Sequence, residues 1–572
     1  MVRANDEAAD LIRELADLLS ITGGDAFKIR AYEKAARAIA GHPDDISGLD
    51  LAGLRKIPTV GEAIARKVLD YTATGTIRQV EELRTQIPAG VRALTAIPTL
   101  GPKKALALYE ELGVSSVDEL AAAIREGRLR GLKGFGPKTE ENILHGIELL
   151  RSSGERVLVD AAATVADEVV AALSALPQVE RCEHAGSLRR MRETIGDVDV
   201  LAASRDPRPV MAAFTALPLV AEVIAGGEKK TSVRTAKGLQ VDLRVVPPES
   251  WGAALQYFTG SQAHNIRTRE IAVKAGLKLS EYGLFHAESN ELIVSETEEE
   301  VYERLGLPWI HPALREDTGE IEAALKGELP RLVTVADLRG DLHSHTDLTD
   351  GVASLEDMVA TAQARGLEYY AITDHAPDLV MQRMTDEKML AQRRRVAELQ
   401  AEYPGMTLLH GTELNIGPDG GVDWDAGFLS GFDICVASVH SHFTQDRDAM
   451  TRRLVRACEN PHVHVIGHPT ARSIGRRAPV DADWDEVFRC AARTGTAMEV
   501  DSFPDRLDLP ADLVRRAKRF GVKFAVDTDA HSVGHHRNIR YGVGTAQRGW
   551  LTPDDVINTW PLERLRAFLR KA

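Results

Sequence analysis

Three aspartates near the middle of the chain have the spacing of a site for two metal ions. Asp197 and Asp199 lie in the stretch Gly-Asp-Val-Asp-Val, and residues two apart in a strand point to the same face. Asp242 interrupts a later apolar stretch, where a buried carboxylate needs a partner or a function. Carboxylates this close repel each other unless cations lie between them. The pattern therefore predicts a pair of Mg²⁺ or Mn²⁺ ions of the kind that in-line phosphoryl transfer uses.

Small and basic residues precede these aspartates. Gly186 and Ser187 would let the backbone approach a triphosphate closely, and Arg190 would neutralise part of its charge. An Asp-x-Asp pair alone is common on protein surfaces. The combination of Gly-Ser, a basic pair, Gly-Asp-Val-Asp-Val and a later strand aspartate favours nucleotide chemistry over that interpretation.

A second set of candidate ligands lies in the C-terminal part, where 12 of the 18 histidines follow residue 330. His343 and His345 form a His-x-His pair, which on a strand places both imidazoles against one cation. Nitrogen and oxygen donors without cysteine suit Zn²⁺ or Mn²⁺, and nine candidates would hold two or three ions. A merely polar rim would not explain why such residues follow successive predicted strands, at 341–351, 373–375, 411–413, 438–440, 467–469 and 528–531.

A glycine turn that recurs in the first 150 residues predicts contact with phosphate. Each copy is an apolar residue, a tight turn and the start of a helix, whose free backbone N–H groups would bind an anion without reading base sequence. One copy alone would be an ordinary helix-helix turn. Three copies favour DNA binding; they lie at 57–61, 97–104 and 132–138, with turn glycines Gly61, Gly101 and Gly136 and with Lys103, Lys104 and Lys138 close behind two of them.

The secondary structure predicted to position these residues changes from helices to alternating helices and strands along the chain. Residues 5–150 have the pattern of short amphipathic helices between Gly and Pro turns. A helix at 161–176 then leads to strands at 196–203 and 239–246, and an acidic helical segment covers 291–325 before a connector at 332–338. Short strands alternating with helices follow, which favours a parallel α/β sheet or barrel; they are predicted at 369–372, 407–410, 434–438, 464–466, 497–500 and 523–526.

Length and composition bound the class of protein. The 572 residues exceed the roughly 250–300 that one core holds, and they predict about three to four domains. No apolar run approaches the ~20 residues that span a bilayer, and the first segment lacks an apolar signal core, so we expect a cytoplasmic protein. The four cysteines form no Cys-x-x-Cys pair, which argues against disulfides and a thiolate zinc site. The whole chain has a net charge of −15, but residues 1–150 have a net charge of only −2, so acidity does not exclude DNA binding there.

The central region resembles the nucleotidyltransferase signature of family X DNA polymerases. The likeness covers residues 185–201 and the later aspartate, and it continues through the Tyr-Phe-Thr-Gly-Ser turn at 257–261. It implies that this turn lies under the incoming sugar and that two downstream residues face the nascent base pair and the template. The residues concerned are Tyr257, Phe258 and Gly260 in the turn, then Asn265 and Arg269.

One position departs from the better-studied eukaryotic members. They carry an arginine two residues before the third aspartate, where this chain has Gln240. Because a cation is lost there, we expect Asp242 to be more basic than its family counterpart.

The N-terminal turns resemble helix-hairpin-helix motifs, which bind DNA without sequence preference. Residues 27–32 and the first hairpin also resemble the small lyase domain of family X enzymes. This likeness implies that Lys67, six residues after Gly61, forms a Schiff base with an abasic sugar. A second family lysine is replaced by Ala63, and an ordinary solvated helix lysine is the alternative interpretation of Lys67.

The histidine motifs resemble the polymerase-and-histidinol-phosphatase (PHP) domain, a distorted (β/α)₇ barrel. Such domains fused to family X polymerases resemble 3′-5′ exonucleases and abasic-site endonucleases, in which divalent ions activate water against a phosphodiester. Asp374 and His442 are expected to orient the ligands. No ligand position departs from the family pattern; the implied ligands are His343, His345, Asp350, His375, Glu413, His440, His468, Asp529 and His531.

The chain is therefore identified as a member of the bacterial family X polymerases with a C-terminal PHP domain. Its expected activities are gap filling in DNA repair and metal-dependent cleavage, with gapped or nicked double-stranded DNA and deoxynucleoside triphosphates as partners, no membrane and a monomeric state. The expected domains are a lyase-like all-α domain with the first hairpin (1–85), a fingers-type helical domain with further hairpins (86–152), an α+β nucleotidyltransferase palm (153–250), a thumb (251–330) and the PHP barrel (335–572).

Two other functions remain open at this point. One is a DNA-repair nuclease whose polymerase region only holds DNA, and the other is a DNA-binding scaffold without catalysis. Three intact aspartates argue against the first alternative, and nine intact PHP ligands argue against the second.

Overall fold

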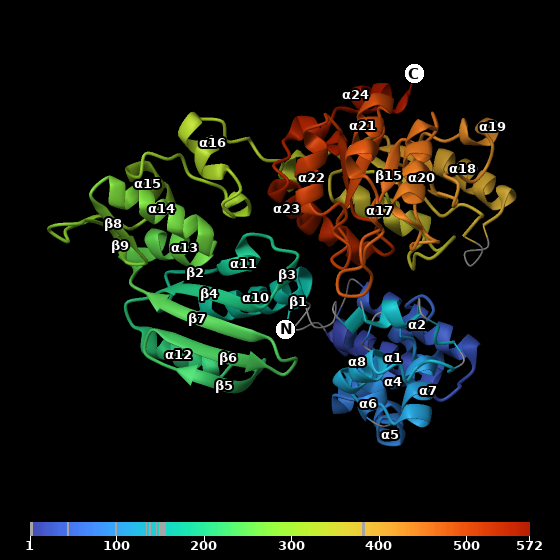
Figure 1. The fold of residues 1–572 in the computed structure, drawn as a ribbon, viewed down its shortest axis with the longest axis horizontal. Coiled ribbons are helices and arrows are strands. Elements are labelled where there is room, and N and C mark those ends of the chain that lie inside the picture. The colour runs from blue at the N-terminus through green and yellow to red at the C-terminus, as the bar shows by residue number, and fades with distance from the viewer. Residues whose placement is uncertain are drawn as a thin grey trace.

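The computed structural model describes residues 4–42, 45–87, 89–95, 97, 100–132, 134–136, 139–144, 146–147, 156–379 and 384–571. In chain order they form a helical body, a palm with a mixed sheet, a thumb with a small sheet, and a parallel barrel (Figure 1). None of the helices within these ranges is long and apolar enough to cross a membrane.

The helical body contains helices and turns but no strand among its described residues, as predicted. Ala8, Ile12 and Leu15 form the buried face of its first helix at the spacing of an amphipathic helix. One apolar core runs from Ala8 to Ile147, so the segments 1–85 and 86–152 pack together. The elements are α1 (Ala4–Ile21), α2 (Ala26–Ala40), η1 (Ile46–Gly48), α3 (Leu51–Leu54), α4 (Glu62–Thr74), α5 (Arg78–Gln86), α6 (Ala89–Thr95), α7 (Pro102–Leu112) and α8 (Val117–Arg125).

The palm is a five-stranded sheet in the order β2-β4-β7-β6-β5. β4 and β7 run parallel, whereas the other neighbouring strands run antiparallel. Val169 and Phe214, from two helices packed on the sheet, are fully buried in its core. The elements are β1 (Val157–Leu158), α10 (Val159–Ser174), β2 (Arg181–His184), α11 (Gly186–Arg189), β3 (Thr194–Ile195), β4 (Asp197–Ala203), α12 (Pro207–Thr215), β5 (Val220–Gly226), β6 (Lys230–Thr235) and β7 (Gln240–Val246).

The thumb corrects one expectation. The acidic segment 291–325, predicted as helical, begins with a strand, because residues 292–294 extend the β8-β9 hairpin as its third strand. Short helices follow it. After the 3₁₀ turn η2 (Pro248–Ser250), the elements are α13 (Trp251–Thr259), α14 (Gln262–Lys274), β8 (Leu277–Ser280), β9 (Gly283–His286), β10 (Leu292–Val294), α15 (Glu298–Arg304), η3 (Pro312–Leu314) and α16 (Glu320–Lys326).

The C-terminal sheet has seven parallel strands in chain order, β11 to β17. Ser344 pairs with Ala530 beyond the first and last strands, so the sheet nearly closes into a barrel. Its strands are buried on both faces, as parallel strands covered by helices must be. They are β11 (Gly340–Asp341), β12 (Tyr369–Ile372), β13 (Thr407–Asn415), β14 (Ile434–Ser438), β15 (Val465–Gly467), β16 (Ala497–Asp501) and β17 (Phe524–Asp527).

Helices and 3₁₀ turns connect these strands. They are η4 (Val335–Asp337), α17 (Leu355–Ala364), α18 (Asp386–Gln400), α19 (Ala426–Leu429), α20 (Arg447–Glu459), α21 (Trp484–Thr494), α22 (Ala511–Lys518), η6 (Val533–Asn538), α23 (Ile539–Arg548), η7 (Pro553–Asp555), η8 (Ile557–Thr559) and α24 (Leu562–Leu569). The predicted strands at 369–372 and 434–438 are confirmed to the residue. β13 is longer than predicted because its first half pairs with β12 and its second half with β14.

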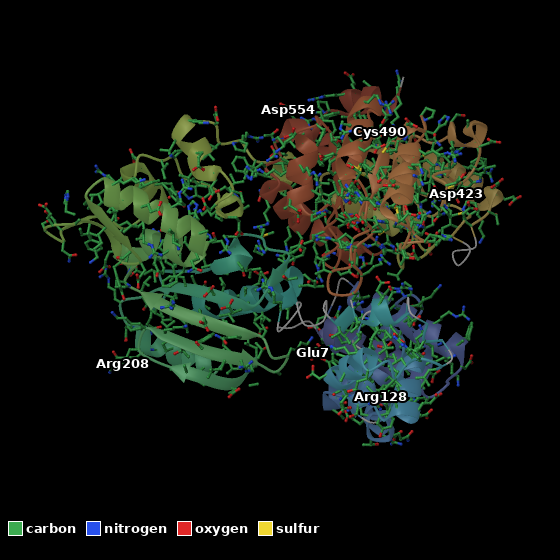
Figure 2. All side chains as sticks on the ribbon, in the orientation of Figure 1. Glu7, Arg128, Arg208, Asp423, Cys490 and Asp554 are labelled. Atoms are coloured by element: carbon green, nitrogen blue, oxygen red, sulfur yellow. The ribbon has the colours of Figure 1, made fainter. Side chains whose placement is uncertain are left out.

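The barrel contacts all three other bodies. Leu507 and Tyr541 pack into the palm core, and Trp550 packs against the thumb core. Gly41 of the helical body approaches Ser532 so closely that a Cβ at Gly41 would lie 2.4 Å from the serine Oγ. Figure 2 shows side chains filling each body, with Glu7 and Arg128 on the helical body, Arg208 on the palm, and Asp423, Cys490 and Asp554 on the barrel.

Candidate active sites and DNA-binding turns

The three palm aspartates converge as predicted. β4 and β7 are neighbours, and their register places Asp199 directly beside Asp242. Asp197 projects from the same face of β4 as Asp199. Carboxylate oxygens of all three residues lie within 4.8 Å of one another. An all-oxygen set of this kind fits Mg²⁺ or Mn²⁺.

The charge of this cluster depends on a cation. Burial, together with repulsion from Asp197 and Asp242, raises the pKa of Asp199 to about 7. Asp199 would therefore hold a proton much of the time at neutral pH unless a cation offsets the neighbouring carboxylates. A divalent ion would supply that charge, which is a physical reason for the cluster to bind one.

Despite Gln240, the pKa of Asp242 is lowered from its ordinary value, and its comparison with the arginine-bearing relatives stays a prediction. Burial opposes ionisation of Asp242, but hydrogen bonds from Lys230, Gln240 and Ser232 outweigh it, so the pKa is lowered. Lys230 Nζ lies 2.8 Å from Asp242 Oδ2, and Gln240 Nε2 donates to Asp242 Oδ1 at 2.9 Å. The neighbouring strand β6 thus supplies the cation that was expected two residues upstream. This replacement depends on strand pairing, which the local sequence does not reveal.

Gly186 brings the backbone against the aspartates. Its φ is +58°, and a Cβ would lie 2.1 Å from Asp199 Oδ2, so only glycine fits without displacement. Arg190 follows one turn later and donates from Nη1 to the main-chain oxygen of Thr259. A Cβ on Gly260 would lie 3.1 Å from that same nitrogen. Gly186, Ser187 and Arg190, which are predicted to bind the triphosphate, therefore lie next to the turn that is predicted to bind the sugar.

The two residues predicted to face the base pair lie beside the same turn. Asn265 Nδ2 donates to the main-chain oxygen of Tyr257 at 2.7 Å, and Asn265 Oδ1 accepts from Gln256 at 2.9 Å. The guanidinium of Arg269 lies 5.5 Å from the centre of the Tyr257 ring. The guanidinium of Arg244 lies 4.4 Å from the centre of the Phe258 ring. These contacts fix the turn at the end of α13 against the start of α14.

In the barrel, all nine predicted ligands gather at the carboxyl ends of the strands. Glu413 lies at their centre and is 1% exposed. Its carboxylate oxygens lie 2.9 Å from His375 Nδ1, 2.9 Å from His468 Nε2 and 3.1 Å from His440 Nε2. Three groups have ligand atoms within 4.8 Å of one another: His345, Asp350, His375 and His531; His343, His345 and Asp529; and His375, Glu413 and His440.

The donor atoms of this cluster fit metal ions. His343 Nε2 and His345 Nε2 lie 3.1 Å apart, and Asp529 Oδ1 lies 3.1 Å from His345 Nε2. His345 Nδ1 is buried and makes no hydrogen bond to the residues described. Buried polar atoms without a partner are costly, and a cation would satisfy them. Six imidazoles and three carboxylates without cysteine suit Zn²⁺ or Mn²⁺.

The carboxylates and imidazoles of the barrel also stabilise each other's charge. Burial opposes ionisation of Glu413, but His440, His375 and His343 outweigh it and hold its pKa well below the usual range. Burial likewise opposes protonation of His375, yet Glu413 and Asp350 raise its pKa well above the usual value. The cluster is thus held together electrostatically by its own side chains.

Two residues that orient the ligands were missed by sequence reasoning. Glu499, on β16, has Oε1 2.7 Å from His343 Nδ1, and its Oε2 accepts a hydrogen bond from the backbone N–H of His468. Asn415, at the end of β13, accepts from His440 Nδ1 at 2.7 Å. Each contact fixes the imidazole so that Nε2 faces the cluster. Glu499 lies alone in the apolar stretch 497–500, a signal comparable to Asp242, so it was recognisable in principle.

Asp374 and His442 occupy different places from those expected of ligand orienters. Asp374 accepts hydrogen bonds from Thr346 N at 2.9 Å, Thr346 Oγ1 at 2.6 Å and the hydroxyl of Thr349. It therefore fastens the loop that leads to Asp350. His442 is exposed, and its ring contacts Ser441 Oγ at 3.0 Å.

The three glycine turns share one backbone pattern. In each, the N–H of the residue before the turn glycine donates to the carbonyl three residues earlier: Val60 to Ile57, Leu100 to Ile97 and Phe135 to Leu132. In each, the glycine carbonyl then accepts from the N–H groups three and four residues later. Gly61 and Gly101 are the N-caps of α4 and α7, and no side chain caps either helix. Their first N–H groups are thus available for an anion.

The lysines near these turns differ in exposure and in contacts. Lys103 is exposed and Lys104 half-buried, with the Lys104 Nζ 5.9 Å from the Phe135 ring of the third turn. Lys67 is half-buried on α4 and has no hydrogen bond or ion pair with the residues described. Lys138 lies outside the described residues.

Comparison with known families matches most of this architecture. A helix-hairpin-helix domain matches residues 3–77, and a SAM-like helix-hairpin-helix tandem matches residues 91–148. A DNA polymerase beta thumb matches residues 254–316, and a PHP domain matches residues 341–501. The barrel itself continues past that match, through β17 to His531.

One relative covers nearly all of both chains. The DNA polymerase/3′-5′ exonuclease PolX of Bacillus subtilis (strain 168) is 35% identical over 98% of this chain and 98% of its own. The chain belongs to the family X DNA polymerases that carry a PHP domain. Other relatives each match only part of this chain. DNA polymerase lambda of Rattus norvegicus is 27% identical over 51% of this chain and 53% of its own length. A probable phosphatase of Thermoanaerobacter sp. (strain X514) is 27% identical over 40% of this chain and 94% of its own length.

Proposed function

We propose that this protein is a DNA-directed DNA polymerase that fills short gaps during repair and also cleaves phosphodiester bonds in its barrel. The single observation that carries the polymerase assignment is the register of β4 and β7, which brings the oxygens of Asp197, Asp199 and Asp242 within 4.8 Å. A surface Asp-x-Asp pair would have no third carboxylate from a neighbouring strand. Two divalent ions held there would stabilise the attacking and leaving oxygens of nucleotidyl transfer.

The chain's own residues would place the nucleotide against this cluster. The backbone at Gly186 and Ser187 would approach the triphosphate, and Arg190 would offset its charge. Tyr257, Phe258 and Gly260 would lie under the sugar, because their turn contacts Arg190 through Thr259. Asn265 and Arg269, fixed beside that turn, would face the base pair and template.

In the barrel, we propose a 3′-5′ exonuclease that also cleaves at abasic sites. The nine ligands would hold two or three Zn²⁺ or Mn²⁺ ions, which supply an activated water and charge stabilisation when bound. Glu413 would join the three ligand groups, because it contacts histidines from several strands. Glu499 and Asn415 would hold His343 and His440 in the orientation that binds metal.

The helical body would hold gapped or nicked duplex DNA by its phosphates. Gly61, Gly101 and Gly136 share one backbone turn, and a Cβ at any of them would meet no other atom of the described residues within 4 Å. Phosphate would therefore reach the helix N-termini unhindered. Lys67 as the lyase nucleophile, a monomeric state and a cytoplasmic location stay predictions. Borohydride trapping on an abasic duplex should label the wild-type protein, and a Lys67→Ala variant that is labelled equally would exclude that lysine.

A time course on gapped DNA tests the proposal and its alternatives. A primer labelled at its 5′ end is incubated with all four deoxynucleotides, once with Mg²⁺ and once with Mn²⁺. We expect template-directed extension across the gap and, without nucleotides, shortening from the 3′ end. Shortening without extension would support the alternative of a nuclease whose polymerase region only holds DNA. Neither reaction, with DNA binding retained, would support a scaffold.

A further inference from the structure

The barrel packs directly on the palm loop that follows Gly186 and Ser187. α23 is the contacting element, and Gly544 in its centre faces Met191 so closely that a Cβ would lie 2.5 Å from Met191 Cε. Tyr541, one turn earlier, is 4% exposed and belongs to the apolar core of the palm. A helix of the nuclease domain therefore forms part of the wall behind the predicted triphosphate site.

A shared carboxylate joins the two domains at this contact. Glu316, between η3 and α16 of the thumb, places Oε1 2.9 Å from Arg548 Nη1 and 3.1 Å from Arg190 Nε. Arg548 Nη1 also donates to the main-chain oxygen of Arg190 at 2.9 Å. The side chains of Arg190, Glu316 and Arg548 are 13%, 18% and 13% exposed, so solvent screens them little.

The sharing has an electrostatic consequence. One carboxylate faces two guanidinium groups, and Arg192 approaches it as a third at 3.9 Å. If Arg548 were absent, Glu316 would pair with Arg190 more completely, since attraction between charges is strong where water is excluded. An Arg190 side chain that is paired with Glu316 would offer less positive charge to a polyphosphate. Loss of Arg548 would also remove the hydrogen bond that the main-chain oxygen of Arg190 accepts.

We propose that Arg548, a residue of the nuclease domain, is a positioning residue for nucleotide binding in the polymerase site. It engages Glu316 and the Arg190 backbone, and so keeps the guanidinium of Arg190 available to the triphosphate. The polymerase site is then completed by the barrel, and its affinity for nucleotide depends on α23. This inference rests on the proposed placement of the triphosphate at residues 186–190.

Steady-state gap filling with the full-length chain tests the proposal. Arg548→Met keeps most of the apolar stem, and we expect it to raise the KM for the incoming nucleotide about tenfold, as loss of hydrogen bonds to a charged group implies, with kcat within about twofold. Arg548→Lys keeps the charge but makes fewer hydrogen bonds, so its KM should lie between. Nuclease activity of the same preparations, unchanged from wild type, shows that the barrel is folded.

A double variant separates positioning from simple fastening of the two domains. Arg548→Met/Glu316→Gln removes the carboxylate that would capture Arg190, so its KM should return toward the wild-type value. If Arg548 only fastened the domains, losing Glu316 as well would leave the KM as high or higher, and that result would overturn the proposal. Arg540→Met is the matched control, because Arg540 lies on the same helix and pairs with Asp167 of the palm at 3.4 Å, away from this loop. Its KM should stay at the wild-type value.

Arg190→Met distinguishes failure of the inference from failure of the site assignment. It should raise the KM for nucleotide at least as much as Arg548→Met does. If Arg190→Met leaves the KM unchanged, the triphosphate does not contact Arg190, and both the placement and the inference fall. If Arg190→Met raises the KM and Arg548→Met does not, the placement stands and only the role of Arg548 is excluded.

Discussion

The carboxylate cluster of the palm and the histidine cluster of the barrel both suit divalent ions, but they differ in burial and in balance of charge. The palm offers three carboxylates, of which Asp197 is exposed, Asp199 is half-buried and Asp242 is buried. The barrel combines three carboxylates with six imidazoles, and Glu413 at its centre is 1% exposed. In the palm, Lys230 offsets only one of the three carboxylates, whereas the carboxylates of the barrel face several imidazoles.

This difference explains how each site would meet its metal. Asp199 has a pKa raised to about 7 because burial and its acidic neighbours disfavour its ionisation, so the palm geometry depends on an arriving cation. In the barrel, ion pairs such as His375 with Glu413 at 2.9 Å hold the ligands together. We therefore expect the palm to exchange its ions readily and the barrel to retain them.

The largest expected effect is the loss of polymerisation when a palm ligand is removed. Asp199→Ala leaves only two carboxylates, which are too few to hold two ions. The loss should cost several kcal/mol of transition-state stabilisation, or about 10³-fold in incorporation rate. Single-nucleotide insertion on gapped DNA measures it. Nuclease activity and DNA affinity should be unchanged, and insertion at the wild-type rate would exclude the palm assignment.

Removal of a barrel ligand should instead abolish cleavage and spare polymerisation, with a loss of similar or slightly smaller size. Asp529→Ala or His343→Ala deletes a ligand of the cluster, so cleavage of a single-stranded 3′ end should fall about 10²–10³-fold. Nucleotide addition should remain measurable, because the palm carboxylates belong to a separate domain. Elemental analysis of protein purified without chelator should show less Zn²⁺ or Mn²⁺ in the variants than in the wild type. A variant that cleaves normally would show that the barrel cluster is not the nuclease site.

Much of this organisation could be predicted, and the rest depends on contacts between distant segments. The palm aspartates and the barrel ligands follow strands whose local patterns are clear, so their convergence was predictable from strand geometry. Lys230 as the partner of Asp242 was not, because it comes from a neighbouring antiparallel strand whose register no local pattern fixes. The strand at 292–294 was missed because its hairpin partner, β9, supplies the pairing that overrides the acidic helical pattern around it.

A smaller effect is expected when an orienting residue of the barrel is changed. Glu499→Gln keeps the shape of the side chain but removes the charge that faces His343 Nδ1 at 2.7 Å. Carboxylates that orient a ligating histidine in this way are worth about 10–100-fold in metal affinity or activity. We expect cleavage to fall within that range and to recover partly at high Mn²⁺ concentration. Asp374→Asn, which acts on the loop at 346–349, should not be rescued by added metal in the same way.

The smallest expected effect concerns the glycine turns, which we propose to bind phosphate without a metal ion. Gly61 and Gly101 have ordinary backbone angles, and among the described residues no atom lies within 4 Å of the place where a Cβ would stand, so valine should leave the fold intact. The added methyl groups would instead meet a DNA phosphate that approaches the helix N-terminus. Each of Gly61→Val and Gly101→Val should therefore weaken DNA binding about tenfold, as expected for lost hydrogen bonds to a charged group.

The loss should be the same for unrelated DNA sequences, since phosphate contacts carry no base information. Fluorescence anisotropy with two gapped duplexes of different sequence measures it. Gly48→Val is the matched control: it lies in the same body, also has open space where a Cβ would stand, and is outside the turns. Equal binding by Gly48→Val and Gly61→Val would show that the turns do not contact DNA. A loss confined to one sequence would instead show that they read bases, which a bare helix N-terminus cannot do.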